Sequence, residues 1–235
     1  MNADLAYALE LADAADALTL PRFRATDLHV ETKPDLTPVT DADRTTERML
    51  RDRIAHDRPG ESVFGEEEGD DGGDVRWILD PIDGTRNFSR GIPVWATLIA
   101  LEREGQIVCG VVSAPALGRR WWAARGEGAS ANGSPIGVSA VRKLSEATVS
   151  CTHARDLAKL EPLVWHARGL GDFWQHVLVA EGALEASVDV QLARWDYAAI
   201  EPIVTEAGGQ LADFRGQTVS TNGLVHDEVM DALSA

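Results

Sequence analysis

Cysteine is scarce in this chain. The 235 residues include only Cys109 and Cys151, and neither has a second cysteine two or three positions away. The spacing therefore argues against a CxxC zinc or redox site. Because Cys109 lies in the apolar run QIVCGVVSA and Cys151 in ATVSCT, we expect two buried free thiols, as in proteins of a reducing cytoplasm.

Basic residues are also in short supply. Lysine and arginine number 22 against 38 acidic residues, which gives a formal net charge of -16. This balance argues against nucleic acid or an anionic membrane as a partner. It suits a protein that binds a divalent cation, because Mg²⁺ and Ca²⁺ sites are built from carboxylates, although a solvated acidic surface explains most of the excess.

Long hydrophobic runs are absent. No stretch approaches about 18 uncharged apolar residues, so no transmembrane helix is predicted. The first segment, MNADLAYALELADAADALTL, has no basic residue and therefore does not resemble a signal peptide. We predict a cytoplasmic protein. Its 44% of hydrophobic residues suffice for the core of one large domain or of two small ones that share an interface.

Several motifs of other enzyme and metal-binding classes are missing. The chain has no G-x-x-x-x-G-K-[ST] phosphate loop, no G-x-S-x-G and no H-E-x-x-H. The acidic run DDGGD lacks the spacing of an EF-hand, and the six histidines are scattered. Any phosphate or metal chemistry must therefore use a different set of residues.

The hydrophobic pattern divides the chain into two halves. Helical spacing predicts a first helix that ends near Pro21. Thr40 and Asp43 form a capping box that predicts a second helix to about Asp57, with a loop over 31–43 before it. We expect a seam near residues 135–147, an α+β half over 1–140 with the metal and phosphate motifs, and an α/β half over 141–235.

The two halves differ in the secondary structure that their sequences predict. Short β-prone runs separated by Gly-, Pro- or charge-rich turns fill the first half after the helices: SVFGEE, VRWILD, VWATLIALE, IVCGVVSAP and RRWWAA. In the second half we predict helices at roughly 155–167, 172–181, 195–207 and 226–234, interleaved with strands at ATVSC, ALEASVDV and GQLADF.

The stretch WILDPIDGTRNF places two carboxylates at the end of a buried strand. Pro81 has no N–H and a fixed φ, so it should stop the ladder and let Asp80 and Asp83 project from one edge. Two close carboxylates repel each other unless a cation lies between them. If Gly84 and Thr85 begin a helix, their N–H groups can bind phosphate. A metal beside a phosphate suits phosphoryl transfer to water.

Two further stretches add carboxylates. Glu66 follows the preceding strand in GEEE, and Asp196 opens a predicted helix in RWDYAAIEPIVTEAGG. A purely structural explanation also fits each motif. Asp83 and Gly84 can form a simple turn with a capping aspartate, and Asp196 can be only a helix N-cap. On these residues alone, both explanations stay open.

Taken together, these stretches resemble the signatures of the inositol monophosphatase family. GEEEG, WILDPIDGTRNF and WDYAAIEPIVTEAGG stand in the family's order and separation, and TKPDLTPVTDAD resembles its mobile catalytic loop. The resemblance covers nearly the whole chain. It implies a layered αβαβα sandwich and Mg²⁺-dependent hydrolysis of phosphate monoesters, with Mn²⁺ as an alternative ion. It also implies a homodimer.

The resemblance assigns roles to the motif residues. Two or three ions are implied: one held by Glu66, Asp80 and the Ile82 carbonyl, a second by Asp80, Asp83 and Asp196, and a weaker third by Asp41 with Glu66. Thr85 would polarise the attacking water, which Asp41 or Glu66 would help to orient. The N–H groups of Gly84 and Thr85, beside Asp83, would hold the phosphate.

The pattern departs from inositol-specific members at two positions. Asp172 stands in GLGDFW where those members carry a small or hydroxyl residue, and Asp189 replaces a glutamate seven residues before Asp196. Within the family, GVVSAPALGRRWWAARG and TNGLVHDEV resemble the actinobacterial-type histidinol-phosphatases. We therefore predict L-histidinol phosphate as the substrate, with Asp172, Asp189, Asp196 and Arg168 around it.

Alternatives remain at this level. Asp172 can be a helix N-cap and Arg168 can pair with a nearby acid. A phosphatase of inositol phosphate or of a related sugar phosphate is the second hypothesis. A binding protein that keeps the fold and senses a phosphorylated metabolite is the third. The third is disfavoured because every expected metal ligand and Thr85 are present.

Overall fold

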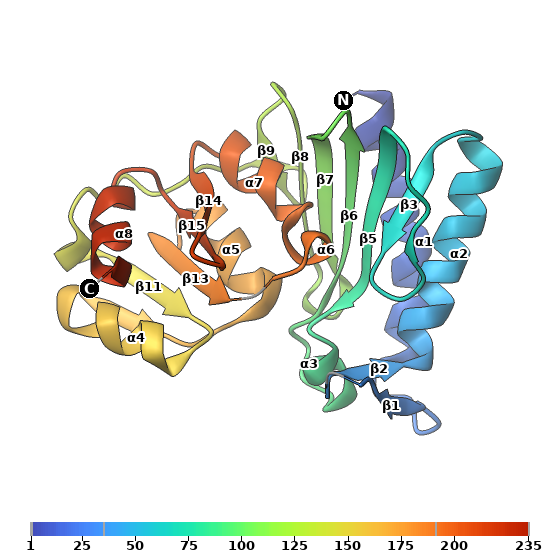
Figure 1. Cartoon of the computed structure of the whole chain (residues 1–235), viewed down its shortest axis with the longest axis horizontal. Helices are drawn as coiled ribbons and strands as arrows, with labels where there is room; N and C mark the ends of the chain where they lie inside the picture. Colours follow the sequence, from blue (N-terminus) through green and yellow to red (C-terminus); the bar gives the residue numbers. More distant parts are fainter. Residues whose placement is uncertain (1, 35, 191, 235) are drawn as a thin grey trace.

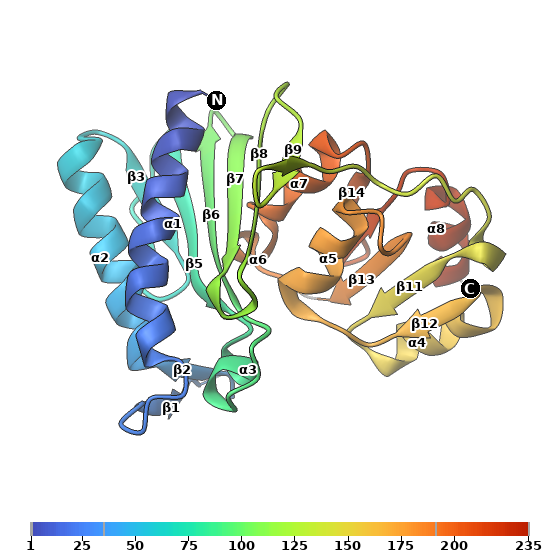
Figure 2. The ribbon, with the colours of Figure 1, turned by 180° about the vertical axis from the view of Figure 1, so that it is seen from behind.

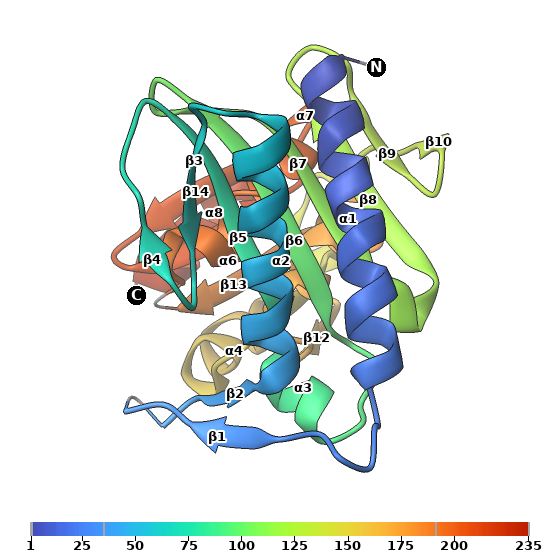
Figure 3. The ribbon, with the colours of Figure 1, turned by 90° about the vertical axis from the view of Figure 1, so that its right-hand side faces the viewer.

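The computed structural model describes residues 2–34, 36–190 and 192–234, which form five alternating layers of helices and sheets (Figure 1). The first layer consists of α1 (Ala3–Arg22) and α2 (Asp41–Asp57), which lie side by side on one face of the larger sheet (Figure 3). The Asn2 side chain caps α1, and the predicted capping box of Thr40 and Asp43 begins α2.

The second layer is an eight-stranded sheet with the order β10-β9-β8-β7-β6-β5-β3-β4. It is antiparallel except where β3 pairs with β5. Its inner strands bury almost every side chain because helices cover both faces. Five strands confirm the prediction: β3 Ser62–Gly65, β5 Val75–Asp83, β6 Ala96–Arg103, β7 Gln106–Ala114 and β8 Arg119–Ala124. The short strands β4 Gly69–Asp70, β9 Ala129–Ala131 and β10 Ser134–Pro135 were not predicted.

The third layer lies between the two sheets (Figure 2). It contains α5 (Asp172–Ala180), α6 (Arg194–Tyr197) and α7 (Ile200–Glu206). Side chains of α5 and α7 share one apolar cluster with the inner face of the larger sheet. This shared core fixes the position of α5 relative to the strand ends of the first half, which matters for the site.

The fourth layer is a five-stranded sheet with the order β12-β11-β13-β15-β14. Its outer face is covered by the fifth layer, α4 (Ala154–Leu160) and α8 (His226–Ser234). The sandwich predicted from the motifs is thus confirmed. The strand bounds are β11 Thr148–Cys151, β12 His166–Arg168, β13 Ala186–Val190, β14 Gln210–Phe214 and β15 Gln217–Thr221.

Several predicted elements are wrong in extent. The helix predicted over 155–167 ends at Leu160, because Pro162 follows in a 3₁₀ turn, and the chain then forms the edge strand β12. The helix predicted over 195–207 is two helices, with Pro202 in the first turn of the second. The strand β15 was not predicted.

Two segments of the first half also differ from the prediction. The loop predicted over 31–43 contains most of a short hairpin, β1 (Val30–Thr32) and β2 (Pro38–Thr40), and residue 35 lies outside the described residues. Pro81 interrupts the ladder as predicted, but pairing with β6 resumes at Asp83. The peptide around Pro81 is held instead by Thr97, whose hydroxyl donates to the Pro81 carbonyl at 2.8 Å.

Two other predictions are supported by the described residues. Cys109 and Cys151 are free and buried. No described helix is long and apolar enough to cross a membrane. The division of the chain at 140/141 falls in the segment that joins the two sheets, and we propose it as the boundary between the halves.

Candidate active site

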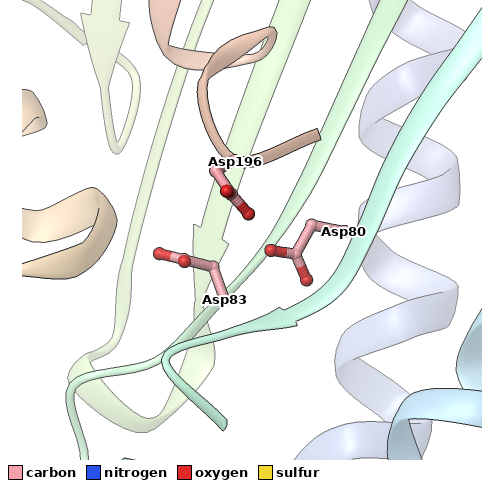
Figure 4. A group of neighbouring side chains, drawn as sticks. All are labelled: Asp80, Asp83 and Asp196. Carbon is pink, nitrogen blue, oxygen red and sulfur yellow. The ribbon is translucent and has the colours of Figure 1, made fainter. Parts of the chain in front are cut away.

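Three aspartates from two distant segments converge where β5 ends (Figure 4). Asp80 and Asp83 lie on β5, and Asp196 lies on α6. Each offers an oxygen within 4.8 Å of the others'. The interrupted ladder at Pro81 makes this convergence possible, because it lets both β5 carboxylates turn to the same edge of the sheet.

The electrostatics of these three residues fit a bound cation. Burial raises the pKa of Asp80 and of Asp83 well above the usual range, and neighbouring carboxylates raise both further. Burial also raises the pKa of Asp196 to about 7. Within the described chain, no lysine or arginine forms an ion pair with any of the three. The cluster offers only hard oxygen donors, which are the ligands that Mg²⁺ and Mn²⁺ prefer.

Glu66 lies in the same cavity wall but is engaged with a lysine. The Lys33 ammonium lies 2.8 Å from its carboxylate. The turn that carries Glu66 is held by the buried carboxylate of Glu47. This carboxylate accepts hydrogen bonds from the N–H groups of Glu67 at 2.8 Å and of Glu68 at 2.9 Å. Gly65 is required there, since a Cβ would lie 2.1 Å from a Glu47 oxygen. The GEEE turn is therefore built to hold a carboxylate at this edge.

Thr85 is the first residue of α3 (Thr85–Ser89) and follows the two aspartates of β5. Its hydroxyl lies 2.9 Å from the Ile82 carbonyl and 3.3 Å from a carboxylate oxygen of Asp43. Asp43 is buried at the start of α2, and burial raises its pKa to about 7. The predicted water-activating hydroxyl thus has a buried acid as its neighbour.

The acid beside Thr85 is not the predicted one. Asp41 is 41% exposed and forms an ion pair with Arg22 at 2.8 Å, so the structure does not bring it to the cavity. The reason is the helical turn at the start of α2. The N-cap Thr40 directs the side chain at the third helical position, Asp43, back toward the site and leaves Asp41 on the opposite side.

Gly84 precedes α3 in a conformation that favours glycine. Its φ is +84°, and a Cβ would lie 3.0 Å from the Val94 carbonyl oxygen. Within the described part of the chain, the N–H groups of Gly84 and Thr85 have no hydrogen-bond acceptor. They lie in the wall of the same cavity as the aspartate cluster, as expected for groups that bind a phosphate beside a metal.

The opposite wall comes from the second half of the chain. Asp172 stands at the start of α5 with a positive φ of 51°, and burial together with repulsion from Asp189 raises its pKa to about 6. It does not cap α5. Asp83 takes that role, because its carboxylate accepts the N–H of Phe173 at 2.7 Å. The Asp172 carboxylate accepts a hydrogen bond from Asn87 at 3.0 Å instead.

Asp189 completes this wall at the end of β13. It is buried, and burial raises its pKa. Gln175 of α5 donates to one carboxylate oxygen at 3.1 Å, and the N–H of Val190 donates to the other at 2.8 Å. Two close aspartates that face one cavity, both with raised pKa values, provide a second place where positive charge is favoured.

Arg168 does not reach this cavity. It lies on β12 at the edge of the sheet, and one strand, β11, lies between it and the position of Asp189 on β13, which makes two strand spacings. Neighbouring strands lie about 4.8 Å apart, so the lateral offset is about 10 Å. Its side chain lines a separate hollow with Trp165 and Trp174.

The cavity between the two walls has a volume of about 550 Å³. This is large enough for a small metabolite, and both halves of the chain contribute to it. Of the predicted site residues, its lining includes Glu66, Asp80, Ile82, Asp83, Gly84, Thr85, Asp172, Asp189 and Asp196, and it excludes Asp41 and Arg168.

Sequence reasoning missed several residues that shape the site. Asp43 and Glu47 carried a signal, because they lie four positions apart on the otherwise apolar, buried face of α2. The others carried no local signal, since their roles depend on contacts with distant segments. The missed residues are Lys33, Asp43, Glu47, Asn87 and Gln175.

The chain belongs to the inositol monophosphatase family, whose model matches residues 2–233. The histidinol-phosphatase of Mycobacterium tuberculosis is 49% identical over 99% of this chain and 98% of its own. That of Streptomyces coelicolor is 46% identical over 98% of this chain and 97% of its own. Among solved structures, the IMPase of Thermotoga maritima matches with a TM-score of 0.92 at 33% identity, covering 98% of this chain and 96% of that one.

Proposed function

We propose that this protein is a Mg²⁺-dependent phosphatase that hydrolyses L-histidinol phosphate to L-histidinol and phosphate. The observation that carries the proposal is the pairing of two acidic clusters in one cavity. Asp80, Asp83 and Asp196 fit a metal beside a phosphate, and Asp172 with Asp189 provides negative charge beyond the metal. Near-full-length similarity to proteins named histidinol-phosphatase supports the same substrate.

The carboxylates of the first cluster are the groups that would hold the ions. Asp80, Asp83 and Asp196 fit one site. Glu66 and the Ile82 carbonyl complete a neighbouring one once the Lys33 ammonium leaves Glu66. When bound, divalent cations lower the pKa of a water molecule and offset negative charge on the phosphate and on the leaving oxygen.

The chain's own groups place the reactants. The Gly84 and Thr85 N–H groups donate to phosphate oxygens. The Thr85 hydroxyl, with its proton directed to Asp43 or to the Ile82 carbonyl, accepts a hydrogen bond from the attacking water and aims it at phosphorus. The water oxygen forms the new bond to phosphorus as the ester P–O bond breaks, and the proton that the water loses balances the one that the leaving L-histidinol oxygen gains. We assign to Asp43 the orienting role that the sequence suggested for Asp41.

Substrate choice follows from the second cluster. Histidinol phosphate carries an ammonium and an imidazole beside its ester, whereas inositol phosphate offers hydroxyl groups. A charge-assisted hydrogen bond from an ammonium to a buried carboxylate contributes roughly 1.5–3 kcal/mol. Asp172, with one carboxylate oxygen not engaged by Asn87, and Asp189 are the acceptors for that group.

The test is a phosphate-release panel with L-histidinol phosphate, inositol 1-phosphate, fructose 1,6-bisphosphate and a nucleotide monophosphate. The proposal predicts the highest kcat/KM for histidinol phosphate. A preference for inositol 1-phosphate would contradict the assignment of histidinol phosphate as the substrate and would keep the assignment of phosphatase activity. Binding without turnover of any ester, with Mg²⁺ or Mn²⁺ present, would favour a metabolite-binding protein instead.

Three finer points stay predictions. The number of ions, two or three, and the use of Mn²⁺ in place of Mg²⁺ require metal titration. The homodimer requires a measurement of mass in solution. The cytoplasmic location requires fractionation of cells that produce the protein.

A further inference from the structure

The contact that crosses the cavity from α3 to α5 has no part in the proposed chemistry. Asn87 lies on α3, two residues after Thr85, and its amide nitrogen donates to the Asp172 carboxylate at 3.0 Å. These two residues come from opposite halves of the chain, 85 positions apart. The contact therefore joins the helix that follows the phosphate-binding residues to the wall that faces the leaving group.

The orientation of the Asn87 amide is determined by its surroundings. Its nitrogen lies within hydrogen-bond distance of two acceptors, the Asp172 carboxylate and the Val94 carbonyl at 2.9 Å. Only the NH₂ end of an amide can donate to both, so a flipped side chain would place an oxygen against two oxygens. Both amide N–H groups are engaged in these hydrogen bonds, so the side chain cannot rotate without losing them.

Asp172 requires such a constraint. Its φ of 51° is uncommon for a residue with a side chain. Its carboxylate forms no direct ion pair among the described residues, and the Arg86 charge reaches it only from a longer distance. The next N–H, that of Phe173, is bound to Asp83. The backbone after Asp172 and the side chain of Asp172 are thus each tied to the first half of the chain, and one carboxylate oxygen is left to face the cavity.

We infer that Asn87 is a positioning residue for substrate selection: it holds the Asp172 carboxylate so that its second oxygen meets the cationic group of the substrate's leaving portion. The inference rests on the proposed function, in which Asp172 accepts that group. It assigns Asn87 no contact with phosphate or metal. Its loss should therefore affect the binding of an amine-bearing ester and not the hydrolysis of a neutral one.

The experiment is a double-mutant cycle with Asn87→Ala and Asp172→Asn, in which each variant is assayed on L-histidinol phosphate and on a neutral ester that the wild type hydrolyses. We expect Asn87→Ala to raise KM for histidinol phosphate by about 3- to 10-fold, as for one lost hydrogen bond, with kcat within about 2-fold. In the Asp172→Asn background the same change should have less than about a 2-fold effect, because the partner is already altered.

Ser89→Ala is the matched control. Ser89 lies on the same helix, and among the described residues its hydroxyl bonds only to the Arg86 carbonyl, so both substrates should be hydrolysed as by the wild type. If Asn87→Ala does not fold, Asn87→Ser, which keeps a donor for the loop at Val94, takes its place. Equal losses on both esters, a loss confined to kcat, or additive effects in the cycle would overturn the inference.

The outcome also separates this inference from the proposed function. If Asp172→Asn leaves the KM for histidinol phosphate unchanged, the assignment of Asp172 to the substrate's cation has failed. If Asp172→Asn has its effect and Asn87→Ala has none, only the positioning role of Asn87 has failed.

Discussion

The two walls of the cavity are built in different ways. The wall that comes mainly from the first half is nearly contiguous: Asp80 to Thr85 offers two carboxylates, a carbonyl, two N–H groups and a hydroxyl within six residues, and Asp196 joins them from α6. The wall from the second half is assembled from single residues on α5 and β13. The first wall can act on any phosphate ester, whereas the second faces only the part of the substrate that differs between esters. Catalysis and substrate selection should therefore be separable by mutation.

Metal removal should have the largest effect because it disables the first wall as a whole. Chelation with excess EDTA should reduce phosphate release to background for every ester, and added Mg²⁺ should restore it. Asp80, Asp83 and Asp196 pair with no lysine or arginine among the described residues, so a divalent cation is the group expected to offset their charge beside the phosphate. Undiminished turnover in EDTA would contradict the metal assignment.

Asp43 and Asp41 form a matched pair that tests the chemistry of the first wall. We expect Asp43→Asn to lower kcat by about 10²- to 10⁴-fold, as for loss of an acid–base partner, on histidinol phosphate and on a neutral ester alike. Asp41→Asn should stay within about 3-fold of the wild type, because Asp41 pairs with Arg22 outside the cavity. A large loss of kcat for Asp41→Asn and a small one for Asp43→Asn would assign the orienting role to Asp41 instead.

The stability of the metal-free protein should fall as the pH rises from 5 to 7. An unfolded aspartate with a pKa of 3.8 has already lost its proton at pH 5, whereas Asp196 and Asp43, with pKa values of about 7, still hold theirs in the folded state. The folded state therefore binds more protons in this window, and each such group can cost up to roughly 1.4 kcal/mol per pH unit.

Thermal melts of the metal-free protein at pH 5, 6, 7 and 8 measure this effect. The melting temperature should decrease to pH 7 and then level off, and Mg²⁺ should reverse the decrease by binding the folded state. A flat profile between pH 5 and 7 would show that the buried carboxylates are compensated in another way. The second wall should contribute less, since the pKa of Asp172 is raised only to about 6.

The difference between the walls also explains what could be predicted from sequence. The first wall is largely local, so the spacing of Asp80, Asp83, Gly84 and Thr85 was enough to make them candidates for a metal and phosphate site, and the structure brings them together. The same locality predicted the capping box of α2, although the choice of Asp43 over Asp41 as the neighbour of Thr85 needed the orientation of that helix turn.

The second wall could not be placed in the same way. Arg168 was expected at the substrate as a residue just upstream of Asp172, and only the sheet order shows that it lies on an edge strand. Asn87 gave no signal, because its partner lies 85 residues away. Contacts of this kind depend on how α5 packs between the sheets, which no local pattern records.

The central claim is that the second wall selects the substrate and the first performs the reaction. The most direct test is the ratio of kcat/KM for L-histidinol phosphate to that for inositol 1-phosphate, measured for the wild type and for Asp172→Asn. Loss of one charge-assisted hydrogen bond should raise KM for histidinol phosphate by roughly 10- to 150-fold and leave the neutral ester nearly unchanged, so the ratio should fall by that factor. An equal loss on both esters, with the ratio unchanged, would contradict the claim.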